Sequence, residues 1–289
     1  MDGPQLRSPA GLPVSVATGR CLVMGVLNVT PDSFSDGGRW LDPGAAVAHA
    51  QAMAADGADL IDVGGESTRP GAARVGEEEE QERVLPVVEA LAAKDVTISV
   101  DTMRASTAAL AADRGATIIN DVSAGQADPE MFRFIAGSDV DYVATHWRGL
   151  SHETPGFDDV VREVRDELMY RIAELIIWGA DPARIIVDPG IGFGKTPEEN
   201  WALIGHTDEL ATLGHRVLLG VSRKRLLEPF APKGAPAHER DAATATLSAL
   251  AAQAGAWGLR VHDVAGTRAT LKIWKAWERG AAYRGADTA

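Results

Sequence analysis

The sequence predicts a single (β/α)8 TIM barrel, and three observations lead to this prediction. Short runs of β-branched and apolar residues alternate with helical stretches along the 289 residues, as in parallel sheets with crossover helices. Eight such runs can be counted. No Ser/Pro-rich linker divides the chain into two domains. An open, doubly wound sheet is the structural alternative, and the number of βα units favours the barrel.

Each predicted strand is apolar almost throughout, as expected of parallel strands that are buried on both faces. The strands are predicted at residues 21–29, 59–65, 96–102, 117–123, 142–147, 184–190, 216–222 and 258–264. Three connections are longer than a barrel needs, namely 29–41, 66–76 and 223–239. All three follow the C-terminal end of a strand, which is the end where barrel active sites are built.

Helix-start signals lie between the predicted strands. Asp42 and Asp128 each precede a proline at a first helical position, and Thr196 with Glu199 forms a capping box. The acidic run 77–82 suits the first turn of a helix, because negative charge there complements the helix dipole. We expect residues 1–20 to be a loose leader, 21–280 the barrel and 281–289 a C-terminal tail.

Composition excludes several function classes. The 28 Lys and Arg against 41 Asp and Glu give a net charge of −13, which disfavours nucleic acid and anionic membranes as partners. The single cysteine, Cys21, excludes a disulfide framework and a multi-thiolate metal site. No apolar run reaches the roughly 18 residues of a transmembrane helix, and the first 20 residues lack the apolar region of a signal peptide. We therefore expect a cytoplasmic protein.

Polar side chains gather at the ends of the predicted strands, where packing alone does not explain them. A buried polar group needs a partner or a function. The residues are Asn28, Asp62 with Glu66, Asp101, Asn120, Thr145 with His146, Asp188, Ser222 with Lys224, and Arg260 with His262. Taken singly, each has a structural interpretation, and Asp62 or Asp121 could cap a turn. Because all eight strands contribute at one end, the pattern indicates an active site.

The set divides by chemistry. Asp101, Asn120 and Asp188 supply acceptors, which suit a flat heterocycle with several N–H donors, such as an amino-pyrimidinone edge. Four cationic or ionisable side chains instead suit a phosphate or diphosphate. These are Arg69, Lys224, Arg260 and His262.

Seven segments in order resemble the signature blocks of the dihydropteroate synthase family. They are 28–38 (NVTPDSFSDGG), 64–72 (GGESTRPGA), 99–102 (SVDT), 120–123 (NDVS), 188–195 (DPGIGFGK), 222–224 (SRK) and 260–263 (RVHD). The resemblance runs from about residue 21 to 280. It implies a homodimeric barrel enzyme of folate biosynthesis and a sulfonamide target. The implied reaction joins 4-aminobenzoate to a dihydropterin-6-ylmethyl diphosphate and releases diphosphate.

The resemblance also implies roles for single residues. It assigns the pterin to Asp101, Asn120, Asp188 and Lys224. It assigns the diphosphate to Asn28, Arg69, Arg260 and His262, with Mg²⁺ near Asn28. It places 4-aminobenzoate beside Thr68, Pro70, Phe193 and Ser222. Asp101, Lys224, Arg260 and His262 are the expected catalytic residues.

The sequence departs from the family pattern at strand 5, where Thr145 precedes His146 and a methionine is usual. Two other functions stay open. A methyltransferase-type pterin barrel shares the acceptors but does not need the two long loops 29–41 and 66–76. A non-catalytic pterin-binding homologue would not need the cations Arg69, Lys224, Arg260 and His262 that this chain retains.

Overall fold

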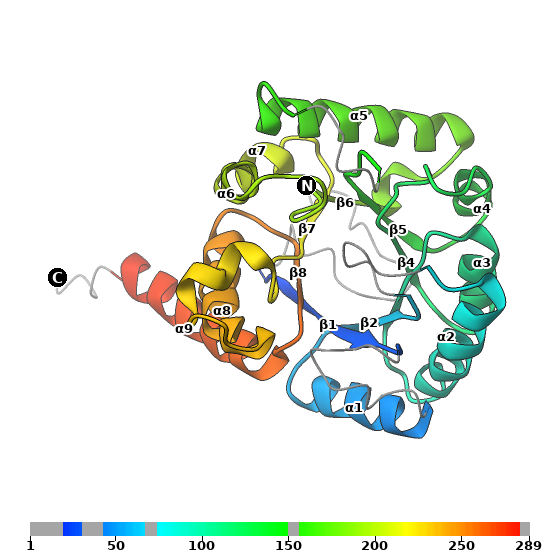
Figure 1. Cartoon of the computed structure of the whole chain (residues 1–289), viewed down its shortest axis with the longest axis horizontal. Helices are drawn as coiled ribbons and strands as arrows, with labels where there is room; N and C mark the ends of the chain where they lie inside the picture. The colour runs from blue at the N-terminus through cyan, green and yellow to red at the C-terminus, as the bar shows by residue number, and fades with distance from the viewer. Residues whose placement is uncertain (1–19, 31–42, 67–73, 150–155, 284–289) are drawn as a thin grey trace, which may run out of the picture.

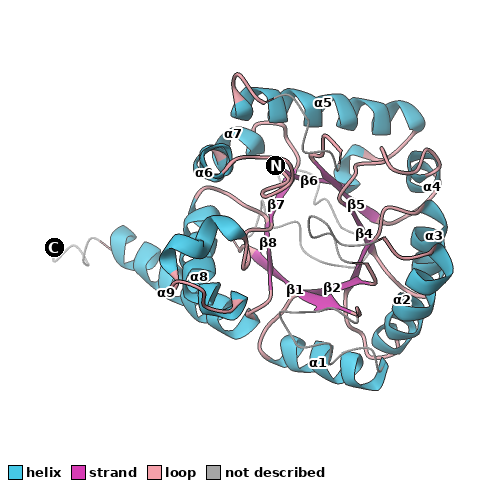
Figure 2. Ribbon diagram, viewed as in Figure 1, coloured by secondary structure: helices cyan, strands magenta, loops and turns pink. Residues whose placement is uncertain are grey.

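The computed structural model describes residues 20–30, 43–66, 74–149 and 156–283, which form a closed barrel of eight parallel strands (Figures 1 and 2). The strands neighbour one another in chain order, from β1 round to β8, so the open-sheet alternative is wrong. They are β1 Leu22–Asn28, β2 Leu60–Gly64, β3 Ile98–Asp101, β4 Ile118–Asp121, β5 Asp141–Thr145, β6 Ile185–Asp188, β7 Arg216–Leu219 and β8 Gly258–Val261. All eight predicted strands are confirmed.

The helices pack around the outside of the barrel, as Figure 2 shows in cyan. They are α1 Pro43–Ala55, α2 Glu77–Ala92, α3 Ala105–Asp113, α4 Met131–Ala136, α5 Val160–Trp178, α6 Pro197–Gly205, α7 Thr207–Ala211, α8 Asp241–Gln253 and α9 Val264–Ala282. No helix in the described part of the chain is long and apolar enough to cross a membrane.

Local sequence signals explain several helix ends. The capping box of Thr196 and Glu199 is present at the start of α6, and α2 begins at Glu77, where the acidic run starts. Asp128 was predicted to cap a helix that starts at Pro129, and α4 begins two residues later, at Met131. Asp128 Oδ1 accepts a 3.0 Å hydrogen bond from the backbone N–H of Glu130, which precedes α4. Asp128 Oδ2 also accepts a hydrogen bond of 2.8 Å from the backbone N–H of Ala105, at the first residue of α3.

The barrel interior is apolar near the N-terminal ends of the strands and polar near their C-terminal ends. Alternate strand residues point inward and form a buried plug near the N-terminal ends of the strands. The plug consists of Leu22, Met24, Leu60, Ile118, Val143, Ile186, Leu218 and Trp257. The polar residues lie at the C-terminal ends, which we call the mouth. Strand register places Asn28 and Asp101 on either side of Gly64, and Asn120 beside Asp101.

Candidate active site

Arg260 of β8 links two carboxylates across the mouth. Its Nε donates to Asp62 Oδ2 at 2.6 Å and its Nη2 donates to Asp101 Oδ2 at 2.8 Å. Asp62 is fully buried, and its carboxylate also accepts from Ser99 Oγ at 2.6 Å and Asn120 Nδ2 at 3.2 Å. No described residue accepts from Nη1 of Arg260, and the side chain is 22% exposed, so it can still meet a ligand.

Asp62 therefore has a larger role than the sequence indicated. It does not cap a turn, since its carboxylate bonds to side chains of β3, β4 and β8. These bonds hold Asn120 and Arg260 in place. The sequence marks Asp62 only as a carboxylate inside an apolar strand. It does not show that the partner is Arg260, which lies 198 residues away in the chain.

Electrostatics at the mouth favour a partly protonated Asp101. Burial raises the pKa of Asp101 to about 7, although the Arg260 guanidinium acts in the opposite direction. Burial also raises the pKa of Asp188, against the lowering effect of Lys224. Both carboxyl groups are poised to bind a ligand that brings N–H donors or positive charge.

Asp188, Lys224 and Phe193 form the opposite side of the mouth. Asp188 Oδ1 accepts a 2.7 Å hydrogen bond from the backbone N–H of Gly190, which fixes the orientation of the carboxylate. Lys224 Nζ donates to the Ile191 carbonyl and lies 4.9 Å from the centroid of the Phe193 ring. Burial lowers the pKa of Lys224 to about 8, with Asp188 opposing the change.

A strained turn after β7 positions Ser222 and Lys224. Arg223 between them has a φ of 58°, in the left-handed region that non-glycine residues rarely adopt. Its guanidinium donates twice to Asp241 of α8, at 2.8 Å each, and Arg240 Nη1 donates to its carbonyl at 2.8 Å. No local sequence pattern predicts this support, because Arg223 and Asp241 are 18 residues apart in the chain.

Ser222 contacts His262 of the segment after β8. Ser222 Oγ accepts from the His262 backbone N–H at 3.1 Å and lies 2.9 Å from His262 Nδ1. These two contacts hold the imidazole of His262 against the segment that follows β7 at the mouth. Ser222 was predicted beside 4-aminobenzoate, and the structure brings it together with the predicted diphosphate residue His262.

Three predicted residues, Thr68, Arg69 and Pro70, lie outside the described residues. The chain on both sides of them is anchored by Arg104, which precedes α3. Its Nη1 donates to Glu66 at 2.9 Å and to the buried Glu80 at 2.8 Å, and its Nη2 donates to the Val75 carbonyl at 2.6 Å. Sequence reasoning missed Arg104 and Glu80 as site supports.

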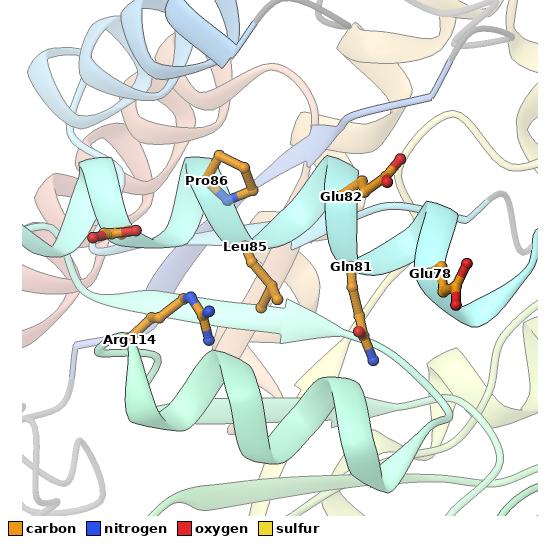
Figure 3. Close-up of a pocket in the computed structure, with 7 residues that line it drawn as sticks. Glu78, Gln81, Glu82, Leu85, Pro86 and Arg114 are labelled. Atoms are coloured by element: carbon orange, nitrogen blue, oxygen red, sulfur yellow. The ribbon is translucent and has the colours of Figure 1, made fainter.

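Two surface hollows lie away from the mouth. One of about 430 Å³ is on the outer wall, where Gln81 and Leu85 of α2 point toward α3 and Arg114 follows the last residue of α3 (Figure 3). The other, of about 400 Å³, is at the closed end of the barrel and is lined by Arg268, Lys272 and Arg279 of α9. Neither contains a predicted site residue.

Comparison with known proteins agrees with this geometry. The family described as "Pterin binding enzyme" matches residues 24–262. The chain belongs to the pterin-binding enzyme family. It is 50% identical over 263 residues to a dihydropteroate synthase of Mycobacterium leprae, covering 88% of this chain and 93% of that protein.

Two solved structures of this pterin-binding family resemble the chain closely. Both are dihydropteroate synthases of Xanthomonas albilineans. The structure with 4-aminobenzoic acid is 43% identical, with a TM-score of 0.87, and covers 95% of this chain and 99% of that one. The structure in complex with 7,8-dihydropteroate is 39% identical, with a TM-score of 0.79, and covers 90% and 93%.

Proposed function

We propose that this pterin-binding enzyme is a dihydropteroate synthase, which condenses (7,8-dihydropterin-6-yl)methyl diphosphate with 4-aminobenzoate and releases diphosphate. The observation that supports this most strongly is the mouth itself. Buried acceptors, Asp188 and Asn120, lie beside the cations Arg260 and Lys224 at the strand ends. A relative named for this activity is 50% identical to the chain over 263 residues.

The pterin ring binds at the acceptors. Asp188 Oδ1 is engaged by Gly190, so Oδ2 is available to accept from the 2-amino and ring N–H edge of the pterin. Oδ2 points across the small residue Gly220 of the mouth, since an added Cβ there would lie 3.7 Å from it. Lys224 reaches the carbonyl side of the ring. Asn120, held by Asp62, completes the set.

The reaction is a dissociative substitution. The C–O bond to diphosphate breaks, and its electron pair leaves with the diphosphate while positive charge spreads into the dihydropterin. Ionised Asp101 stabilises that charge, and Arg260 and His262 stabilise the leaving group. The lone pair of the arylamine nitrogen then forms the new C–N bond, and the nitrogen loses a proton to solvent. The arylamine needs positioning more than activation, and Phe193 provides one wall for it.

We also propose that Mg²⁺ accompanies the diphosphate at Asn28. No group of three or more His, Cys, Asp or Glu suited to a metal occurs among the described residues. Mg²⁺ needs no such cage, because it keeps several waters and binds through one or two protein oxygens plus substrate phosphates. Asn28 Oδ1 meets this requirement: the absent side chain of Gly64 leaves it facing the same space as Asp101. Bound Mg²⁺ would neutralise charge on the leaving diphosphate.

The test is diphosphate release from the dihydropterin diphosphate with Mg²⁺, with and without 4-aminobenzoate. We expect release that depends on 4-aminobenzoate, yields dihydropteroate and stops when Mg²⁺ is chelated. Tight pterin binding without release would identify a non-catalytic homologue. Methyl transfer from a reduced folate to a corrinoid protein would identify the methyltransferase alternative.

We further propose a homodimer that forms through α9. Figure 1 shows the last turns of α9 projecting away from the barrel wall. This helix exposes Ile273 (70%) and Trp277 (61%), and the neighbouring α8 exposes Leu250 (55%). Exposed apolar side chains grouped in this way are typical of an interface. Sedimentation should give twice the monomer mass, and Trp277→Glu should shift the protein to monomer.

A further inference from the structure

Lys195 closes the turn that follows β6. Its Nζ donates to the carbonyls of Gly190 at 2.9 Å and Phe193 at 3.2 Å, and it lies 3.0 Å from His146 Nδ1. An ammonium group has three N–H donors, so each one has a partner here. The turn is thereby tied to itself and to the end of β5.

His146 transmits a further restraint from α5. The ring is buried, with 3% of the residue exposed, and its Nε2 lies 2.9 Å from Glu167 Oε2. Nδ1 accepts from Lys195, so Nε2 carries the proton and donates to Glu167. Burial lowers the pKa of His146 to about 4, which keeps the ring neutral and able to accept. A continuous chain of hydrogen bonds therefore connects α5, β5 and the turn.

The turn in its observed shape contacts three predicted site residues. The Gly190 N–H orients Asp188, the Ile191 carbonyl accepts from Lys224, and the turn itself carries Phe193. Gly190 fits tightly against β5, because an added Cβ would lie 2.1 Å from the His146 carbonyl oxygen. Asp188 and Lys224 have backbone anchors on β6 and after β7, whereas the backbone of Phe193 belongs to the turn and its ring meets Lys224 from there.

We propose that Lys195 is a positioning residue for the second substrate, because its ammonium, oriented by His146 and Glu167, holds the turn so that Phe193 faces the arylamine. The proposal rests on the proposed function for its kinetic consequence. The part of the proposal that concerns the shape of the turn does not depend on that function.

The charge environment makes this restraint sensitive to pH. The groups that face Lys195 come from several elements. They are His146 and Arg148 from the segment after β5, Glu167 from α5, Asp188 from β6 and Lys224 from the turn after β7. Burial lowers the pKa of Lys195 to about 7, with Asp188 opposing the change. A neutral amine has only two N–H donors, so one acceptor loses its hydrogen bond as pH rises through about 7.

The kinetic experiment compares wild type, Lys195→Met, His146→Leu and the exposed control Lys233→Met between pH 6 and 9. The assay contains saturating dihydropterin diphosphate. The denaturation midpoint of each variant is measured to check that the variant is folded. Lys195→Met should raise KM for 4-aminobenzoate about tenfold at pH 6, as expected for loss of charged hydrogen bonds, and change kcat by less than about twofold. His146→Leu should raise KM by less, and Lys233→Met should leave it unchanged.

Wild type should show a rise of this KM above pH 7, and Lys195→Met should lack that rise. A crystal structure of Lys195→Met gives a readout that needs no activity. We expect a displaced Phe193 and Gly190 carbonyl, with the β6 backbone unmoved. An unchanged turn, or an unchanged KM with its pH dependence intact, would overturn the proposal. An inactive wild type with a displaced turn in the variant would overturn the proposed function and leave the role of Lys195 in shaping the turn supported.

Discussion

The two ends of the barrel each hold an arginine paired with a buried carboxylate, and the two are used differently. At the closed end, Arg216 Nη1 donates to Asp141 Oδ2 at 2.7 Å, Nη2 donates to the Ala183 carbonyl at 3.1 Å, and the guanidinium lies 5.1 Å from the Trp257 ring centroid. At the mouth, Arg260 serves two carboxylates and stays partly exposed. Arg216 is paired with one carboxylate and is buried, whereas Arg260 is paired with two carboxylates and is partly exposed.

This difference separates a structural ion pair from a binding device. A sealed one-to-one pair has no spare donors for a ligand, and its loss leaves a buried charge without a partner. A network with an uncompensated carboxylate and a partly exposed guanidinium changes its energy when a charged substrate arrives. The largest predicted effects follow from breaking each pair in turn.

The closed-end pair should matter most for stability. Arg216→Met leaves Asp141 buried without its cation and should lower the free energy of unfolding by about 3–5 kcal/mol. Turnover per folded molecule should stay near wild type. Denaturant titration measures the loss, and the double variant Arg216→Met with Asp141→Leu should recover much of it, because both charges are then removed. A double variant as unstable as the single one would contradict this account.

Arg260 should matter most for turnover. Its loss removes a donor from the developing charge on diphosphate, so Arg260→Met should raise the barrier by roughly 2.7–4 kcal/mol, or about 10²–10³ in kcat. Steady-state kinetics at saturating substrates measures the change in kcat, with Arg216→Met as the control that removes an arginine paired with a carboxylate away from the mouth. Unchanged turnover in Arg260→Met would remove Arg260 from the leaving-group site.

Asp101 should give the mouth an acidic limb in its pH profile. Because the pKa of Asp101 is raised to about 7, kcat/KM for the pterin diphosphate should fall about tenfold per pH unit below 7, as the carboxylate takes up a proton. Asp101→Asn should be slower at neutral pH and should lack this limb. A profile with the same limb in the variant would assign the titration to another group.

Stability provides an independent check on the same group. Between its ordinary pKa of 3.8 and about 7, folded Asp101 holds a proton that the unfolded chain releases. The free energy of unfolding should therefore decrease as pH rises through this window, and Asp101→Asn should reduce that slope.

Thr145 should produce the smallest effect. It is buried at the end of β5, paired in register with Asp188, at the position where the resemblance leads us to expect methionine. Thr145→Met adds apolar contact to the pterin and should tighten its binding by roughly 1 kcal/mol, or about fivefold. Calorimetric titration with a non-reactive pterin measures the change, with Thr145→Ser as a control that should show no gain.

Much of the fold could be predicted from local patterns, because apolar runs with buried faces and capping residues are encoded within a few neighbours. The eight strands, the start of α2 and the capping box of α6 belong to this class. The start of α4 lies two residues beyond the one that Asp128 predicts. The Asp128 carboxylate serves two elements, because Oδ1 accepts from the N–H of Glu130 before α4 and Oδ2 accepts from the first N–H of α3.

The residues of the site could be predicted from the sequence, but the hydrogen bonds between them could not. Polar residues at the strand ends and the family resemblance identified Asp101, Asn120, Asp188 and Arg260. The partners that hold them did not follow, because barrel closure brings Asp62 to Arg260 across 198 residues and His146 to Lys195 across 49. Such pairings depend on strand register and helix packing, which no local pattern encodes.

A crystal structure of the chain with the dihydropterin diphosphate is the most direct test of the different roles of the two barrel ends. We predict the amino-pyrimidinone edge of the pterin on Asp188 and Asn120, the diphosphate on Arg260 and His262, and Arg216 still paired with Asp141 at the closed end. A pterin bound away from Asp188, or a diphosphate in the α9 hollow, would contradict the account.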